Sequence, residues 1–341
     1  MNIDQLPIPT FYNPHKVNEV WRVPYQQRAQ AAAAWAQQHN IAPANEDQMR
    51  VGLLLIDVQN TFCLPGFELF VGGRSGTGAV EDNQRLCEFI YRHLGVISAI
   101  AATMDTHTAM QIFHPGFWIN KTGDHPTSAT LITPEEVAQG IWKVNPAVAA
   151  SISNGNYQLL QNHALHYVKQ LTQHGKYPLT VWPYHAMLGG ISHALVSAVE
   201  EAVFFHTIAR NTQARFEIKG NNPLTENYSV LHPEVLTGVD GQAIARKNTE
   251  LIKYLLKFDK LIIAGQAKSH CVAWTIDDLL TEIKSFDSSL TQKIYLLEDC
   301  TSPVVIPDIV DYTEQAEAAF EKFAAAGMHI VKSTQAGDWL V

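Results

Sequence analysis

The chain has 341 residues, of which 46% are hydrophobic and 17% charged, and its formal net charge at pH 7 is −9. This composition is typical of a globular protein with enough residues to bury a sizeable core in one large or two small domains. A negative charge balance without a Lys/Arg cluster argues against a surface for nucleic acid or anionic membrane. No apolar run is long enough to cross a bilayer, so we expect neither nucleic acid nor membrane as a partner.

The four cysteines are far apart and form no C-x-x-C pair: Cys63, Cys87, Cys271 and Cys300. Neither a disulfide framework nor a thiolate zinc site is therefore indicated. The first residues, from Met1 to Pro7, contain no basic region followed by an apolar stretch, which argues against a secretory signal. We expect a reducing, cytoplasmic setting.

Residues 1–48 are interpreted as an N-terminal extension. Irregular, proline-rich chain comes first, and an Ala/Gln-rich helix is predicted around Gln26 to Gln38. This helix is expected to pack on the main body of the protein or on a partner subunit.

Residues 49–341 are expected to form a single domain in which buried strands alternate with helices. Apolar strands are predicted at 51–57, 96–104, 214–218, 261–264, 293–297 and 329–332, and helices at 80–94, 192–209, 242–256, from about 271, and at 312–326. Continuous apolar strands separated by helices favour an α/β fold with a mostly parallel six-stranded sheet and helices on both faces. The stretch from about 108 to 178 breaks this alternation and is interpreted as a long insertion or lid.

Five residues that can carry chemistry come at the ends of predicted strands: Asp57, Asp105, His107, Lys219 and Cys271. In parallel α/β sheets, ligands bind outside the carboxyl ends of the strands. Cys271 falls in the first turn of a predicted helix, where free N–H groups and the helix dipole favour a thiolate. It is therefore a candidate nucleophile, and the alternative is a small buried residue that packs the helix on the sheet.

Asp57 and Lys219 suit a reactive thiol. The carboxylate of Asp57 could accept the proton of Cys271, and the ammonium of Lys219 could stabilise the thiolate and orient the carboxylate. The alternatives are a cap on the turn that follows Asp57 and an ordinary surface charge at Lys219.

A metal site is suggested by Asp105-Thr106-His107, because alternate residues at a strand end can turn toward one ion where the chain curves. His185 is a candidate third ligand and His114 a further candidate for metal or substrate. One carboxylate with two imidazoles suits Zn²⁺, Fe²⁺ or Mn²⁺, with zinc expected first. The alternative is that these histidines are structural, since a D-x-H pattern also arises by chance.

Five segments in order carry a resemblance to a known family. They are Ile56-Asp57-Val58-Gln59-Asn60-Thr61-Phe62, Asp105-Thr106-His107, Trp182-Pro183-Tyr184-His185, Lys219-Gly220 with Tyr228-Ser229 downstream, and Ala264 to Val272. Over roughly residues 50–335, the chain resembles the isochorismatase-like cysteine hydrolases, and among them the nicotinamidases. Lys268 and Ser269 stand where the family usually has Thr and Asp, which alters the expected pocket wall.

The resemblance implies an Asp57–Lys219–Cys271 triad and a divalent metal held by Asp105, His107 and His185. It also implies a cis peptide at Gln266–Ala267, an oxyanion hole formed by the N–H groups of Ala267 and Cys271, and substrate contacts from Phe62 and Trp182. The function it implies is hydrolysis of a small amide, with nicotinamide as the first candidate. It also implies a homo-oligomer, in which the N-terminal extension could take part. The alternatives are another ureido, carbamoyl or vinyl-ether substrate, and a catalytically silent binding protein.

Overall fold

The computed structural model describes residues 5–173 and 177–340 of the chain. Within it the chain forms two compact units. Unit 1 comprises Met1–Met104, Ala194–Glu217 and Thr249–Val341, and unit 2 comprises Asp105–His193 and Ile218–Asn248. None of the described helices combines the length and apolar character needed to cross a membrane.

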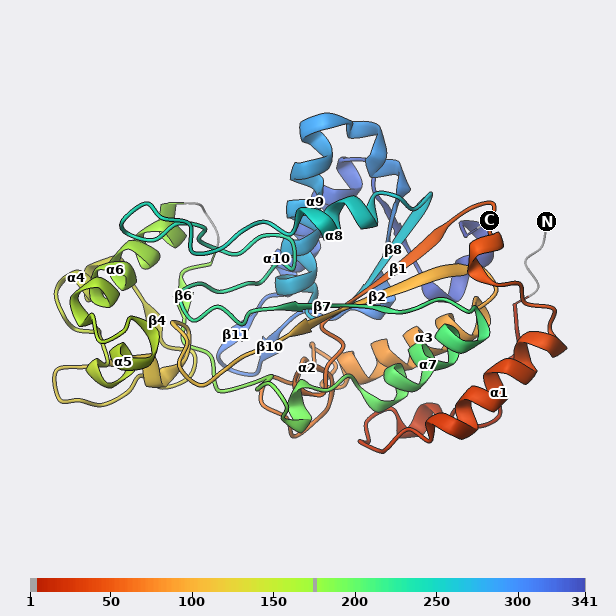
Figure 1. The fold of residues 1–341 in the computed structure, drawn as a ribbon, viewed down its shortest axis with the longest axis horizontal. Helices are drawn as coiled ribbons and strands as arrows, with labels where there is room; N and C mark the ends of the chain where they lie inside the picture. The colour runs from red at the N-terminus through yellow and green to blue at the C-terminus, as the bar shows by residue number, and fades with distance from the viewer. Residues whose placement is uncertain (1–4, 174–176, 341) are drawn as a thin grey trace. The chain divides into compact units, whose positions relative to one another are not determined.

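The main sheet has six strands in the order β12-β9-β8-β1-β2-β7 (Figure 1). The bounds are β1 (Val51–Ile56), β2 (Ile97–Asp105), β7 (Arg215–Lys219), β8 (Lys260–Gly265), β9 (Ile294–Leu297) and β12 (His329–Val331). β1 pairs in parallel with β2 and β8, and β9 pairs in parallel with β8 and β12. The predicted α/β fold with a six-stranded, mostly parallel sheet is confirmed.

The burial of each strand agrees with its place in the sheet. Every residue of β1 and β2 is buried, as expected for central strands that are covered on both faces. At the edge of the sheet, β7 instead alternates, with the apolar side chains of Phe216 and Ile218 exposed. The last residues of β2 and β7, including Asp105 and Lys219, belong to unit 2.

Helices cover both faces of the sheet within unit 1 (Figure 1). One layer contains α1 (Tyr25–Gln38), α3 (Gly78–Arg92) and α7 (Ser197–Ala209), and the other contains α8 (Thr249–Leu255), α9 (Ala273–Phe286) and α10 (Thr313–Ala325). α8 begins later than the helix predicted at 242–256. Residues 243–248 are irregular instead, apart from an isolated antiparallel bridge between Ala243 and Thr237.

The first 48 residues contribute to the core of unit 1. Val17 and Ala32 are fully buried in it, and α1 packs along α7. Arg28 donates from Nε to Glu201 Oε1 at 2.7 Å, which joins these two helices by an ion pair. Burial raises the pKa of Glu201, although Arg28 partly offsets that effect.

Unit 2 has a hydrophobic core of its own. The helices of unit 2 are α4 (Pro134–Ala138), α5 (Ala149–Ile152) and α6 (Tyr157–Gln173). Two antiparallel pairs of short strands accompany them: β3 (Trp118–Ile119) with β5 (Lys143–Val144), and β4 (Leu131–Ile132) with β6 (Leu179–Thr180). Phe113, Phe117, Trp118, Leu160 and Tyr167 are all buried in this core. The segment interpreted as an insertion is therefore a folded body with its own core, and unit 2 also takes in residues 218–248.

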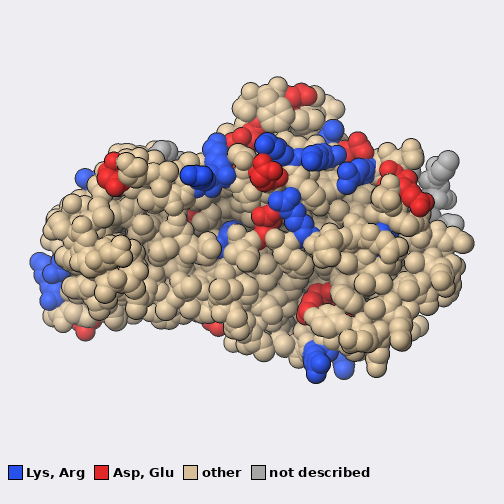
Figure 2. All heavy atoms as spheres, in the orientation of Figure 1, with Lys and Arg blue, Asp and Glu red and all other residues tan. Residues whose placement is uncertain are grey.

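Charged side chains of both signs share the molecular surface. On the face drawn in Figure 2, Lys and Arg side chains are intermingled with Asp and Glu side chains. Some of the charges in unit 1 form ion pairs, among them Arg215 with Glu217 at 2.5 Å and Lys253 with Glu250 at 3.1 Å. Lys253 and Glu250 are exposed, and an exposed pair of this kind contributes only about 0–1 kcal/mol to stability.

Candidate active site and metal centre

Asp57 follows β1 directly and is fully buried in unit 1. Its backbone lies in the left-handed region, with φ of 48°, and its N–H donates to Thr103 Oγ1 at 3.0 Å. The hydroxyl of Thr103 on β2 in turn donates to Asp57 Oδ1. These two bonds fix the carboxylate at the carboxyl end of β1.

The segment that carries Cys271 begins at the same edge of the sheet. Gly265, the last residue of β8, pairs with Ile56, the last residue of β1, and the N–H of Gln266 donates to the Ile56 carbonyl at 2.7 Å. Gly265 has φ of 122°, and a Cβ there would lie 2.1 Å from the Ile56 oxygen, so only glycine fits. Asp57 and Gln266 thus leave the sheet side by side.

Cys271 lies in a short π-helix, Lys268–Val272, which leads into α9. Cys271 is 8% exposed. The Gln266–Ala267 peptide that precedes the π-helix is cis, as the family resemblance implied. No hydrogen bond from the N–H of Ala267 is found within the described part of the chain. The oxyanion hole expected from the N–H groups of Ala267 and Cys271 stays a prediction. π-Helical turns are frequent at functional sites.

Lys268 and Ser269, which replace the family's usual residues, hold this segment in unit 1. Lys268 Nζ lies 2.7 Å from Glu317 Oε1 and 4.5 Å from the ring centroid of Phe320, both on α10. Ser269 Oγ accepts from the N–H of Val304 at 3.0 Å. Both side chains therefore serve to anchor the turn that carries the thiol.

Unit 2 brings together the three residues predicted as metal ligands. One ligand atom from each of Asp105, His107 and His185 lies within 4.8 Å of the others, and all three residues are buried. Nε2 of His107 is 2.8 Å, and Nε2 of His185 is 3.4 Å, from the same Asp105 oxygen, Oδ2.

The second ring nitrogen of each histidine sets its tautomer. Nδ1 of His107 bonds to the Gly220 carbonyl at 3.0 Å and Nδ1 of His185 to the Pro183 carbonyl at 2.7 Å. A carbonyl only accepts, so each Nδ1 carries a proton, and each Nε2 faces Asp105 Oδ2, where it would present a lone pair to a metal ion in place of a proton. Two lone pairs and a carboxylate that converge in a buried space are the donor set of a divalent cation. The residues fit a metal.

The charges of this group are held by their surroundings. Burial raises the pKa of Asp105, but His107, Lys219 and the hydrogen bonds from both histidines outweigh it and keep the pKa well below its usual value. Burial and the neighbouring His107 lower the pKa of His185. An ionised carboxylate beside a neutral imidazole is the state that binds a metal ion.

His114 lies beside the three ligands but is not one of their group. Its ring centroid is 5.6 Å from that of His107 and 5.8 Å from that of His185. Nδ1 bonds to the Thr108 carbonyl at 3.1 Å, and the buried Nε2 has no partner within the described residues. Burial, together with His185 and His107, lowers its pKa to about 3. Its role in binding metal or substrate stays a prediction.

Lys219 also lies in unit 2, whereas Asp57 and Cys271 belong to unit 1. Within unit 2 its ammonium donates to Asp105 Oδ1 at 2.8 Å and to the Asn227 carbonyl at 2.9 Å. Lys219 therefore neutralises the carboxylate of the metal group. Its predicted part in a triad with Asp57 and Cys271 stays a prediction.

The two predicted substrate contacts are likewise divided between the units. Phe62 lies in α2 (Asn60–Cys63) and is 9% exposed. In unit 2, Trp182 donates from Nε1 to the hydroxyl of Tyr228 at 3.2 Å. Their contact with substrate stays a prediction.

Several residues that shape these groups were not found from the sequence. Thr103 holds Asp57, Gly220 accepts from His107, and buried Glu226 hydrogen-bonds Trp182 and Tyr228. Burial and the nearby Glu234 and Asp105 raise the pKa of Glu226 well above its usual value. The Lys219-Gly220 pair was a signal for Gly220, but no local pattern marks Thr103 or Glu226.

Gly220→Ala is expected to disrupt the metal group. Gly220 has φ of 83°, and a Cβ there would lie 2.7 Å from both Asp105 Oδ1 and His107 Cε1. We expect metal content to fall well below that of the wild-type protein and the unfolding free energy to drop by about 1–3 kcal/mol. Elemental analysis and thermal unfolding measure the two effects.

Gly123→Ala is the matched control, because Gly123 also has a positive φ, 94°, but no atom lies within 4 Å of its Cβ position. This variant should lose stability from backbone strain alone and keep its metal. Equal metal content in both variants would show that the ligands do not depend on close approach at Gly220.

Comparisons with known proteins agree with this architecture. No family model matches the sequence, and no curated protein matches it. Among solved structures, the yeast nicotinamidase Pnc1p is similar with a TM-score of 0.50 and 19% identity, over 82% of this chain and 99% of that one. A nicotinamidase/pyrazinamidase from Acinetobacter baumanii is similar with a TM-score of 0.48 and 17% identity, over 85% of this chain and 99% of that one. An isochorismatase-like hydrolase from Alkaliphilus metalliredigens has a TM-score of 0.42 and 10% identity, over 85% of this chain and 98% of that one. The chain therefore has the α/β fold of the yeast nicotinamidase Pnc1p.

Proposed function

We propose that the protein is a metal-assisted cysteine hydrolase that releases ammonia from a small amide, with nicotinamide as its first candidate substrate. The observation that carries this proposal is the buried group of Asp105, His107 and His185, whose tautomers and charges suit a divalent metal. The likeness in fold to a yeast nicotinamidase supports the choice of substrate class.

In the proposed reaction Cys271 is the nucleophile and Asp57 the base. Asp57 accepts the thiol proton, and the thiolate attacks the amide carbonyl carbon to give a tetrahedral adduct. The N–H groups of Ala267 and Cys271 donate to its oxyanion, and losing one such donor typically costs about 10²–10³ in rate. The C–N bond then breaks, and ammonia leaves with the proton that Asp57 held.

The second half of the reaction regenerates the thiol. Asp57 accepts a proton from water, whose oxygen attacks the thioester carbon. The C–S bond then breaks to give the carboxylic acid, and Asp57 returns its proton to the sulfur of Cys271. Lys219 is proposed to stabilise the charges of the ionised groups. Asp105, His107 and His185 would hold the metal, zinc first and iron or manganese next, which would supply Lewis acidity toward a substrate heteroatom.

An ammonia-release screen tests this proposal. The full chain, loaded in turn with Zn²⁺, Fe²⁺ or Mn²⁺, is assayed with nicotinamide, pyrazinamide and small ureido compounds. We expect the largest kcat/KM for nicotinamide. Turnover restricted to ureido compounds would keep the chemistry but overturn the substrate, and no ammonia from any of them would overturn the amidohydrolase proposal.

A further inference from the structure

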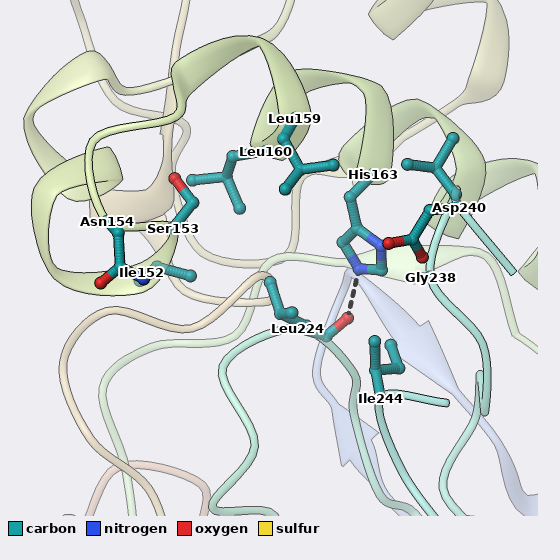
Figure 3. Close-up of a pocket in the computed structure, with 11 residues that line it drawn as sticks. Ile152, Ser153, Asn154, Leu159, Leu160, His163, Leu224, Gly238, Asp240 and Ile244 are labelled. Carbon is teal, nitrogen blue, oxygen red and sulfur yellow. Dashed lines mark hydrogen bonds between the residues drawn. The ribbon is translucent and has the colours of Figure 1, made fainter. Parts of the chain in front are cut away.

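Unit 2 contains a pocket that the proposed hydrolysis does not use (Figure 3). It has a volume of about 270 Å³ and lies among the end of α5, the start of α6, and the segments around Leu224 and Asp240. Ligand pockets for drug-sized molecules measure about 300–1,000 Å³, so this one suits a smaller molecule.

The walls of this pocket are largely aliphatic. Side chains from four separate segments form them: Ile152, Leu159, Leu160, Leu224, Val239 and Ile244. Leu159 and Val239 are each 42% exposed although both are large and apolar. A hydrocarbon body that covered them would remove this apolar surface from water, which is favourable.

His163 supplies a directed polar atom within these walls. It is 4% exposed, and its Nε2 bonds to the Leu224 carbonyl at 2.9 Å, as the dashed line in Figure 3 marks. Because a carbonyl only accepts, Nε2 carries the ring proton, and burial lowers the pKa of His163 so that the ring is neutral. Nδ1 therefore presents a lone pair, and it has no hydrogen-bond partner within the described residues.

Asp240 places a second acceptor beside the first. Its carboxylate lies next to the imidazole of His163 in Figure 3 and is close enough to act on the charge of the ring. Oδ1 accepts from the N–H of Gln242 at 3.0 Å, which orients the carboxylate. The lone pair of His163 Nδ1 and the Asp240 carboxylate are both hydrogen-bond acceptors, and they suit a ligand whose donor group carries a positive charge.

We propose that this pocket binds a small organic cation, an amine carried on a hydrocarbon body. The ammonium donates to the Asp240 carboxylate and to Nδ1 of His163, and the hydrocarbon lies against the leucine and isoleucine side chains. Specificity for charge arises at Asp240 and specificity for size arises from the walls. This site is independent of the proposed hydrolysis, since none of its residues belongs to the proposed catalytic or metal group.

Benzylamine and its neutral isostere benzyl alcohol test the proposal on the full chain. Binding is followed in ¹³C-methyl spectra of a sample labelled at Ile, Leu and Val. We expect saturable shifts with benzylamine at the methyl groups of Leu159, Leu160, Leu224 and Ile244, and binding of benzyl alcohol weaker by about five- to tenfold.

The variant Asp240→Asn removes the charge and keeps the shape. It should lower the affinity for benzylamine by about the same factor, five- to tenfold, and leave the affinity for benzyl alcohol unchanged. Asp308→Asn, which removes an exposed charge in unit 1, is the matched control and should bind benzylamine as the wild-type protein does. Absence of saturable binding, shifts at other methyl groups, or equal affinity in Asp240→Asn would each overturn the proposal.

Discussion

Cys271→Ala is expected to abolish ammonia release. In the proposed reaction the thiolate forms the only covalent bond to substrate, so its loss should reduce kcat by about 10⁴-fold or more. Alanine suits this buried position in the π-helix before α9, so the unfolding midpoint should change little. A coupled ammonia assay and a thermal unfolding curve measure the two effects separately.

Cys87→Ala is the control for this variant. Cys87 is fully buried in α3 of unit 1, and burial raises the pKa of its thiol, so it should be neither nucleophilic nor required. The two cysteines should also differ toward iodoacetamide, with fast labelling of Cys271 and none of Cys87 in the folded protein. Full activity in Cys271→Ala would show that Cys271 is not the nucleophile, and slow, pH-insensitive labelling of Cys271 would favour a silent binding protein.

The central strands could be predicted because burial on both faces removes any ambiguity from their sequence. β1 and β8 are short apolar runs that end at Asp57 and at Gly265-Gln266, and both lie where the pattern put them. The cluster of Asp105 and His107 followed from the end of β2. His185 came from the family resemblance and from its proline-containing loop, and the structure places it beside them.

Unit 2 was harder to predict because its strands are only two residues long. Such strands give no periodic signal. α6 did carry one, since Leu160, Ala164, Val168 and Leu171 recur at helical spacing and are buried. The prolines and tryptophans that precede α6 favoured the interpretation of this region as an irregular insertion or lid. The separate hydrophobic core was therefore not predicted.

Long-range hydrogen bonds explain the remaining gaps. Thr103 and Asp57 are 46 residues apart, and Lys219 and Asp105 are 114 residues apart. Lys219 was predicted to stabilise the thiolate of Cys271. Its contact with the Asp105 carboxylate could not be predicted from the sequence around either residue. Register between strands decides such pairs, and register is set by the whole sheet.

His107→Ala is expected to remove the metal and the activity together. Nε2 of His107 is one of two imidazole nitrogens beside Asp105 that would bind the ion, and without it a single histidine and one carboxylate remain. Metal content should fall from one ion per chain to a small fraction of that. The rate of ammonia release should fall by about 10²-fold or more, because loss of a ligand exceeds the 10–100-fold cost of losing an outer hydrogen bond.

His166→Ala is the matched control, because His166 also lies in unit 2 and also bonds through a ring nitrogen to a carbonyl, that of Thr237. Its ring lies outside the group of three ligands, so metal content and rate should stay at wild-type values. Elemental analysis after dialysis, with and without a chelator, measures the metal in both variants. If His107→Ala keeps its metal while activity falls, then His107 acts on substrate and the assignment of ligands is wrong; if metal is lost without loss of activity, the ion is structural and the hydrolysis proceeds without it.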